Sequence, residues 1–219
     1  MDGTTTTNGT NGTEGTGLSA KGTRLNRRGL QTRQHVLRVA VSCLATGGPE
    51  SVSANLVARQ AGVTWGTVQH QFGDVDGLWA AVLDFVAVEG GPMLDHMPDQ
   101  TDLAERVDAV VEMLWRALDL PISRAIHQLR TALPQDRGEL EVAFPRTARA
   151  IAAWDVHWAG AVDTAFAGLD VDRVRLARVR AMLPAAMRGL RVEHGMSTYL
   201  DIEEARIGLR DAVTAYLSS

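Results

Sequence analysis

The stretch SANLVARQAGVTWGTVQHQF, residues 53–72, decides the fold of the N-terminal part of the chain. It holds two short segments with apolar residues at helical spacing, separated by Gly62. Ala58 is small where two crossing helices must approach closely, and Gly62 permits the positive φ of a tight turn. The other apolar positions are those that a helix-turn-helix buries between its two helices: Val57, Ala61, Val63 and Val68. The stretch therefore predicts a helix-turn-helix.

Hydroxyl side chains mark where its two helices begin. Ser51 or Ser53 can cap a helix over about 54–61, and Thr64 can cap the helix that follows. In a helix-turn-helix the second helix places its N-terminal residues against base edges in the major groove. Gln can pair with adenine, and Thr can contact phosphate or a thymine methyl group. The residues predicted to contact DNA are Ser53, Ala54, Asn55, Thr64, Trp65, Gly66, Thr67, Gln69, His70 and Gln71.

Two of these residues keep alternative interpretations. Trp65 either contacts thymine methyls and sugars or packs against the first helix of the domain. His70 either contacts phosphate or packs against the neighbouring helix.

Charge is unevenly distributed along the chain, whose net charge is −4. Residues 18–72 hold seven basic side chains and one acid, Glu50, whereas residues 73–219 hold 15 basic and 23 acidic side chains. A basic N-terminal third on an acidic body indicates a polyanionic partner at one end only. Arg27 and Arg28 are therefore added to the predicted DNA contacts. The alternative is a solvated basic helix face without a partner.

The rest of the chain is predicted to be helical. We expect a helix before the helix-turn-helix, with Thr32 as its N-cap and Gly47-Gly48 at its end, and another from Asp76 to Gly90. Further helices are expected over about 103–118, 121–133, 138–166, 171–193 and 202–217, with Pro145 either starting or kinking the long one. Few alternating β-branched runs occur. The predicted fold class is all-α, with about nine helices and no sheet.

At this point the chain resembles the TetR family of transcriptional regulators. The resemblance rests on residues 32–83, in particular on the Ala-Gly-Val turn, the Gly-Thr-Val run, His70-x-Phe72 and Leu78-x-x-x-Val82. It implies an all-α homodimer whose N-terminal domain binds an operator in double-stranded DNA and whose body binds a small-molecule effector. The domains are then a disordered tail and basic arm at 1–28, a helix-turn-helix domain at 29–75, and a helical ligand-binding and dimerisation domain at 76–219.

Two residues depart from the family pattern. Gln69 stands where the family usually has Tyr, and Val75 stands where it usually has Lys at the start of the fourth helix. Both family residues commonly touch phosphate. The arm, with Lys21, Arg24, Arg27 and Arg28, either replaces these contacts or only makes the chain more soluble.

The body from residue 90 onward shows no catalytic constellation. Its histidines are scattered, no cysteine partner exists for a zinc site, and no phosphate loop or Gly-x-Ser-x-Gly motif occurs. We expect neither an enzyme nor a metal or cofactor. Large residues with polar neighbours instead suggest a pocket for an apolar ligand, with ordinary core packing as the alternative for each of them. The candidate pocket residues are Met113, Trp115, His127, Arg130, Phe144, Trp154, His157 and Trp158.

The last two predicted helices carry stripes of small and apolar residues suited to close packing with a second subunit. The candidate interface residues are Met182, Ala186, Gly189, Leu190, Leu209 and Val213. The alternative is helix packing within one monomer.

These features predict a cytoplasmic dimeric repressor that an effector releases from a palindromic operator. The sequence has no apolar run long enough to span a membrane and no signal peptide, and its single cysteine, Cys43, fits a reducing compartment. The alternatives are an activator, a regulator controlled by a partner protein, and a non-specific architectural DNA binder.

Overall fold

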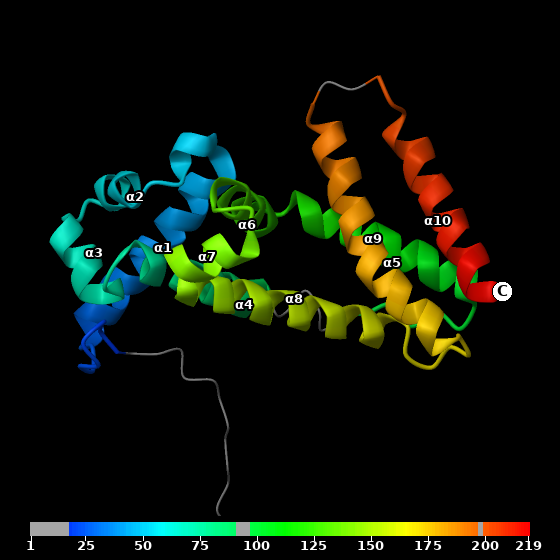
Figure 1. Cartoon of the computed structure of the whole chain (residues 1–219), viewed down its shortest axis with the longest axis horizontal. Coiled ribbons are helices and arrows are strands. Elements are labelled where there is room, and N and C mark those ends of the chain that lie inside the picture. Colours follow the sequence, from blue (N-terminus) through cyan, green and yellow to red (C-terminus); the bar gives the residue numbers. More distant parts are fainter. Residues whose placement is uncertain (1–17, 91–96, 197–198) are drawn as a thin grey trace, which may run out of the picture.

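The computed structural model describes residues 18–90, 97–196 and 199–219. Ten α-helices lie in these ranges (Figure 1): α1 Arg27–Thr46, α2 Ala54–Gln60, α3 Trp65–Phe72, α4 Val75–Gly90, α5 Leu103–Asp119, α6 Pro121–Ala132, α7 Arg137–Ala143, α8 Pro145–Ala165, α9 Arg173–His194 and α10 Ile202–Ser218. A short 3₁₀ turn spans Pro49–Ser51. The described residues contain no strand, only an isolated bridge between Leu18 and Arg24. The all-α prediction is confirmed, whereas residues 1–17 of the predicted tail and arm lie outside the described ranges.

The first helix begins earlier than predicted. Asn26 is its N-cap, because its side chain accepts a hydrogen bond from the backbone N–H of Gly29 at 2.8 Å. Thr32 lies inside the helix and donates its hydroxyl to the carbonyl of Arg28. Arg27 and Arg28 therefore belong to the first turn of α1, which corrects their placement in a disordered arm.

The helix-turn-helix has the predicted caps and turn. The Ser53 hydroxyl accepts from the N–H of Leu56 at 3.3 Å, and the Thr64 hydroxyl accepts from the N–H of Thr67 at 3.2 Å. Gly62, between the two helices, has a φ of 65°, which a residue with a Cβ adopts only with strain.

The expected long helix at 138–166 is two helices. Phe144 has φ −137° and ψ 62°, a non-helical conformation that ends α7, and Pro145 occupies the first position of α8. A proline has no N–H to donate and is best tolerated at this position, because the first N–H of a helix has no partner within the helix. Pro145 therefore starts a helix, the first of the two alternatives, and this break raises the helix count to ten.

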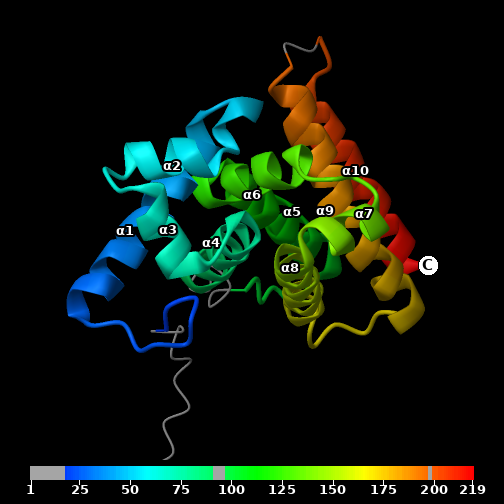
Figure 2. The ribbon, with the colours of Figure 1, turned by 60° about the vertical axis from the view of Figure 1, so that its left-hand side comes forward.

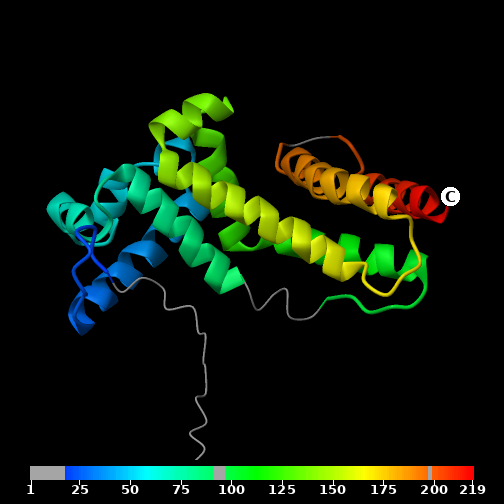
Figure 3. The ribbon, with the colours of Figure 1, turned by 60° about the horizontal axis from the view of Figure 1, so that its bottom comes forward.

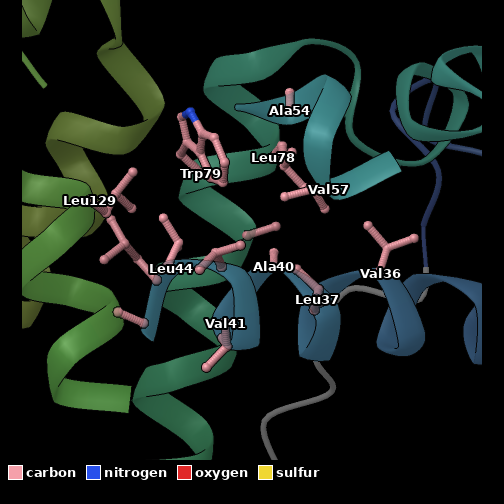
Figure 4. Close-up of a cluster of buried hydrophobic side chains, with 14 of the residues drawn as sticks. Val36, Leu37, Ala40, Val41, Leu44, Ala54, Val57, Leu78, Trp79 and Leu129 are labelled. Carbon is pink, nitrogen blue, oxygen red and sulfur yellow. The ribbon is translucent and has the colours of Figure 1, made fainter. Parts of the chain in front are cut away.

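Two hydrophobic cores hold the chain together. In the first, the buried side of α1 packs with residues of α2, α4, α6 and α8, including Leu44, Val57, Trp79 and Leu129 (Figure 4). The second joins α5, the C-terminal half of α8, α9 and α10. The core of the predicted helix-turn-helix domain is therefore continuous with the first part of the body, and packing does not divide the chain at residue 75.

The arrangement puts the helix-turn-helix and the last two helices at opposite ends. Helices α1–α3 lie at one end, α9 and α10 lie side by side at the other, and α8 runs between them (Figures 1 and 3). Figure 2 shows α4 and α6 between α1 and the rest of the body. No helix in the described ranges is long and apolar enough to cross a membrane. The described residues also contain no group of three or more His, Cys, Asp or Glu that could hold a metal ion.

Candidate nucleic-acid interface

The first turn and a half of α3 present an open polar surface. Thr64, Gly66 and Gln69 are exposed, and Thr67 is half-buried. A Cβ built on Gly66 would meet only the Thr64 hydroxyl, at 3.7 Å, so that another molecule has room to approach this backbone closely. Asn55, in the first turn of α2, is also exposed, and the N-cap Ser53 is half-buried.

Of the other predicted contacts in α2 and α3, three are buried or half-buried and one is exposed. Ala54 is 8% exposed and packs in the first core, so its side chain is not available and the prediction for it is wrong. Gln71 is 4% exposed, and its Nε2 donates to the carbonyl of Gly29, which removes it from the reading face as well. Trp65 is half-buried against the first core, as in its packing alternative. His70 is exposed, so it does not have the packing role.

The segment before α1 is folded against the C-terminal end of α3 (dark blue in Figure 1). The N–H of Ala20 donates to the carbonyl of His70 at 3.2 Å. Ser19 is buried; its N–H donates to the carbonyl of Thr23 at 2.8 Å, and its hydroxyl accepts from the N–H of Thr23. Residues 18–25 therefore form a tight loop that is fixed to the recognition helix.

Arg33 of α1 holds the end of the same helix. Its Nη1 donates to the carbonyl of Gln71 at 2.7 Å, and its guanidinium lies 4.4 Å from the centre of the Phe72 ring. A cation at the C-terminal carbonyls of a helix also complements the helix dipole. Burial lowers the pKa of Arg33, although the nearby charge of Asp84 opposes this shift.

The turn from α3 to α4 is joined to the start of α8. Asp76 Oδ2 accepts from the backbone N–H of Arg146 and from its Nε, both at 3.0 Å, and Asp76 Oδ1 accepts from the N–H of Thr147 at 2.8 Å. The Thr147 hydroxyl donates to the carbonyl of Asp76, and Arg146 also contacts Asp74. Because Phe144 provides no side-chain cap, Asp76 caps α8 from another helix. We call these residues the α4–α8 junction.

The junction shifts the pKa values of its charged groups. Burial by itself would raise the pKa of Asp76, but the hydrogen bonds from Thr147 and Arg146 together outweigh it and lower that pKa below its ordinary value. Burial opposes the charge of Arg146, yet the hydrogen bonds and charges of Asp76 and Asp74 raise its pKa.

This lowered pKa predicts a pH-dependent contribution to stability. The folded state favours the carboxylate of Asp76, so its contribution is complete well above the unfolded value of about 3.9 and is lost as the pH falls through the lower folded value. The difference in free energy of unfolding between the wild type and Asp76→Asn should therefore shrink as the pH falls below about 4. Urea titrations from neutral pH to pH 3 measure it, and a difference that stays constant or grows in acid would contradict the assignment.

The predicted pocket residues are divided between the two cores and the surface. Phe144 and Trp154 pack against the first core, whereas Met113, Trp115 and Trp158 pack against the second. His127 and His157 are exposed. The hollows of about 310 and 590 Å³ lie beside the 18–25 loop, and none of the eight residues lines either of them.

Some of the eight residues do meet at the seam between the two cores. The rings of Trp154 and Trp158 lie 5.9 Å apart, and Arg130 holds Asp155 through two hydrogen bonds of 2.7 and 3.2 Å. Arg188 of α9, which the sequence analysis did not single out, lies near Arg130. The pKa of Arg188 is lowered, first by burial and then by the charge of Arg130. Trp115 is instead enclosed by Arg191, Arg206 and His194, at 5.8, 4.9 and 5.9 Å from its ring.

This chain is similar to known proteins in the arrangement of its helices. No protein-family model matches the sequence, and no curated protein matches it. Solved structures do match: a transcriptional regulator from Rhodococcus sp. Rha1 has a TM-score of 0.63 and 21% identity, covering 84% of this chain and 95% of its own. A regulator from Rhodococcus sp. that is assigned to the TetR family has a TM-score of 0.60 and 21% identity over 86% of this chain and 100% of its own. This chain has the TetR-family fold.

A third structure with the TetR fold is EbrR, described as a multidrug binding protein complexed with imidazole. It has a TM-score of 0.60 and 19% identity over 91% of this chain and 97% of its own. The three neighbours are named as regulators or as a binding protein, in agreement with the expectation that this chain is not an enzyme.

In this TetR fold α9 has an outer face with exposed apolar residues. Val174, Met182 and Val192 of α9 are 59%, 46% and 39% exposed, and Gly189 is exposed between them. Ala186, Leu190 and Leu209, also predicted for the interface, are half-buried. Val213 is fully buried in the second core of its own subunit, which corrects its assignment to an interface. The exposed Val174 and Val192 were missed, although they continue the helical spacing of Met182.

The residues of the α4–α8 junction were also missed. Asp76 and Arg146 are 70 positions apart, and neither belongs to a local pattern that would pair them. The only available signal was a carboxylate in the first turn of α4, which by itself reads as a favourable charge at a helix N-terminus.

Proposed function

We propose that this protein is a sequence-specific DNA-binding transcriptional regulator, most simply a dimeric repressor that leaves its operator when a small apolar ligand binds the body. The observation that carries the proposal is the exposed polar N-terminal part of α3. It lies at the basic end of the TetR fold, on a helix whose C-terminal carbonyls accept hydrogen bonds from Ala20, Arg33 and Arg146. A rigid helix with an exposed polar start is what readout in the major groove requires.

In this proposal Gln69 reads bases, and Gly66 allows close approach of the backbone. Thr64, Asn55 and Ser53, at the starts of α3 and α2, contact the sugar-phosphate backbone, as do Arg27 and Arg28 at the start of α1. The side chains of Ala54, Gln71 and Trp65 play no part in readout.

Replacing Gln69 with Ala should weaken binding to the operator by about tenfold or more while leaving binding to an unrelated duplex unchanged, since a bidentate base contact contributes about 1–3 kcal/mol. Fluorescence anisotropy with DNA flanking the protein's own gene, at about 150 mM salt and with unrelated duplex as competitor, measures both affinities. Equal affinity of the wild type for both duplexes would instead indicate an architectural DNA binder.

The dimer is proposed through the open face of α9 and α10. Two TetR-fold subunits paired there would present two recognition helices to a palindrome, with half-sites about 34 Å apart. Exposed apolar residues such as Val174, Met182 and Val192 support this face, because burial against a second copy removes them from water.

Met182→Glu should therefore yield a monomer, since the charge would be buried at the centre of the interface. Val142→Glu is the matched control, because Val142 is 85% exposed on α7, away from this face, and its replacement should leave a dimer. Light scattering coupled to size-exclusion chromatography distinguishes the two. A Met182→Glu protein with the mass of the wild-type dimer would rule out this interface.

A small-molecule effector is proposed for the seam that Trp154, Trp158 and Arg130 occupy. The ligand-bound structure of EbrR, which shares the fold, supports an effector of this class. A change of about 100-fold in DNA affinity needs a ligand that distinguishes the two states by about 2.7 kcal/mol. A panel of apolar compounds that neither stabilises the protein against heat nor releases operator DNA would favour control by a partner protein, as repressor or as activator.

A further inference from the structure

A hollow of about 310 Å³ lies between the 18–25 loop, the start of α1 and the recognition helix α3. Arg24 of the loop and Arg28 of α1 line it from one side, and Thr67 and His70 of α3 line it from the other. None of the described residues that line it is acidic, and the sequence has no Asp or Glu between Glu14 and Glu50. The hollow is therefore positively charged.

The guanidinium groups of the two arginines have no partner among the residues that the structure describes. Within the described part of the chain, the guanidinium groups of Arg24 and Arg28 form no ion pair and no hydrogen bond, and both side chains are exposed. The nearby Arg33, by contrast, is committed to the Gln71 carbonyl and the Phe72 ring. A guanidinium carries donors in a fork that suits phosphate oxygens, so this pair is free to bind an anion.

The geometry of the loop makes this an ordered site. Arg24 is paired with Leu18 in a backbone bridge, and the adjacent Thr23 bonds with Ser19 through both its N–H and its carbonyl. The N–H of Ala20 then ties the loop to the carbonyl of His70 on α3. The base of the loop therefore moves with the recognition helix, and little further ordering is required when an anion binds.

We propose that this hollow seats a DNA phosphate at the edge of the major groove that α3 enters, with Arg24 and Arg28 as its cationic ligands and Thr67 and His70 closing it from the helix. We call it the phosphate seat. The proposal rests on the proposed function, because it commits the anion to the operator backbone. It supplies cationic contacts in a chain that has Gln69 and Val75 at positions where Tyr and Lys commonly touch phosphate in the TetR family.

The salt dependence of DNA binding tests the phosphate seat. Each phosphate contact that is lost should reduce the slope of log K against log[salt] by about one, and should weaken operator and unrelated duplex to the same extent. Because both arginines bind the same phosphate, each of the variants Arg24→Ala and Arg28→Ala should reduce the slope by up to about one, and the double variant by about one. Arg24→Lys should keep the wild-type slope, because a point charge is sufficient for counterion release.

Arg173→Ala is the matched control. Arg173 is an exposed arginine at the start of α9, at the opposite end of the molecule from α3 (Figure 1), and its replacement should leave the slope unchanged. Thermal unfolding of the Arg24 and Arg28 variants should match the wild type, since neither guanidinium forms a contact that folding depends on.

The outcomes separate the phosphate seat from the function on which it rests. If the wild type binds its operator specifically but the Arg24 and Arg28 variants keep its salt slope, the phosphate seat is wrong and the proposed function stands. If these variants lose affinity for the operator only, the arginines read bases, and the seat is again wrong. If the wild type binds no duplex, the proposed function fails first.

Discussion

Replacing Asp76 with Ala is expected to lower the free energy of unfolding by about 3 kcal/mol, the scale of leaving a buried hydrogen-bonding group without its partner. Asp76 is 8% exposed and accepts three hydrogen bonds at the start of α8. Its loss would leave the N–H of the fully buried Thr147 without a partner and the Arg146 guanidinium without one of its two carboxylates. Urea titration monitored by circular dichroism measures the change.

Asp155→Ala is a matched control for this variant. Asp155 also holds an arginine, Arg130, at 2.7 Å, but its side chain is 55% exposed and that of Arg130 is 39% exposed. Water screens such a pair, so the cost should be below about 1 kcal/mol. Similar losses for the two variants would show that Asp76 is only another surface charge.

The Asp76→Ala variant is also expected to bind DNA more weakly at temperatures where it remains folded. The α4–α8 junction holds the turn that follows α3, and Arg146 reaches back to the Phe72 carbonyl at the end of that helix. Without Asp76 the orientation of α3 is less strictly held, and the cost of ordering it is then paid on binding. Operator affinity should fall with a nearly unchanged salt slope, in contrast to the variants of the phosphate seat.

Gly77→Ala is expected to destabilise the protein by about 3 kcal/mol, at the upper end of the overpacking range. A Cβ at this position would lie 2.0 Å from the Phe72 carbonyl oxygen and 2.6 Å from Arg146 Nη1. The first of these atoms is backbone, so that relief requires α3 and α4 to move apart. The same methyl group would displace the Arg146 side chain, and operator affinity should fall together with stability.

Gly160→Ala is the comparison that isolates this clash. Gly160 is an exposed residue of α8, and a Cβ there would meet nothing within 4 Å. Alanine is the better helix former, so this change should stabilise the protein by up to about 1 kcal/mol. Unfolding free energies measured side by side should differ in sign, and a neutral Gly77→Ala protein would show that the helices at the junction are not closely packed.

Local chemistry was sufficient to predict the helix-turn-helix. Ser53 and Thr64 cap their own helices and Gly62 takes the positive φ that the turn requires, and each of these features depends on neighbours within a few residues. Even local signals can compete, however. Asn26 and Thr32 are both residues that can cap a helix near the start of α1. Asn26 accepts the capping hydrogen bond, so that the helix begins at Arg27 and includes Arg28.

The sequence by itself determined the all-α class, the helix-turn-helix and the uneven charge, because periodicity, capping and composition act over short distances along the chain. Only the tertiary structure decided which polar and apolar residues face outward. Gln71 is polar and Val213 lies on a stripe suited to a second subunit, yet packing against α1 and within the second core buries them. The α4–α8 junction and the basic hollow beside the 18–25 loop likewise exist only after folding, because each is made by residues far apart in sequence that meet in space.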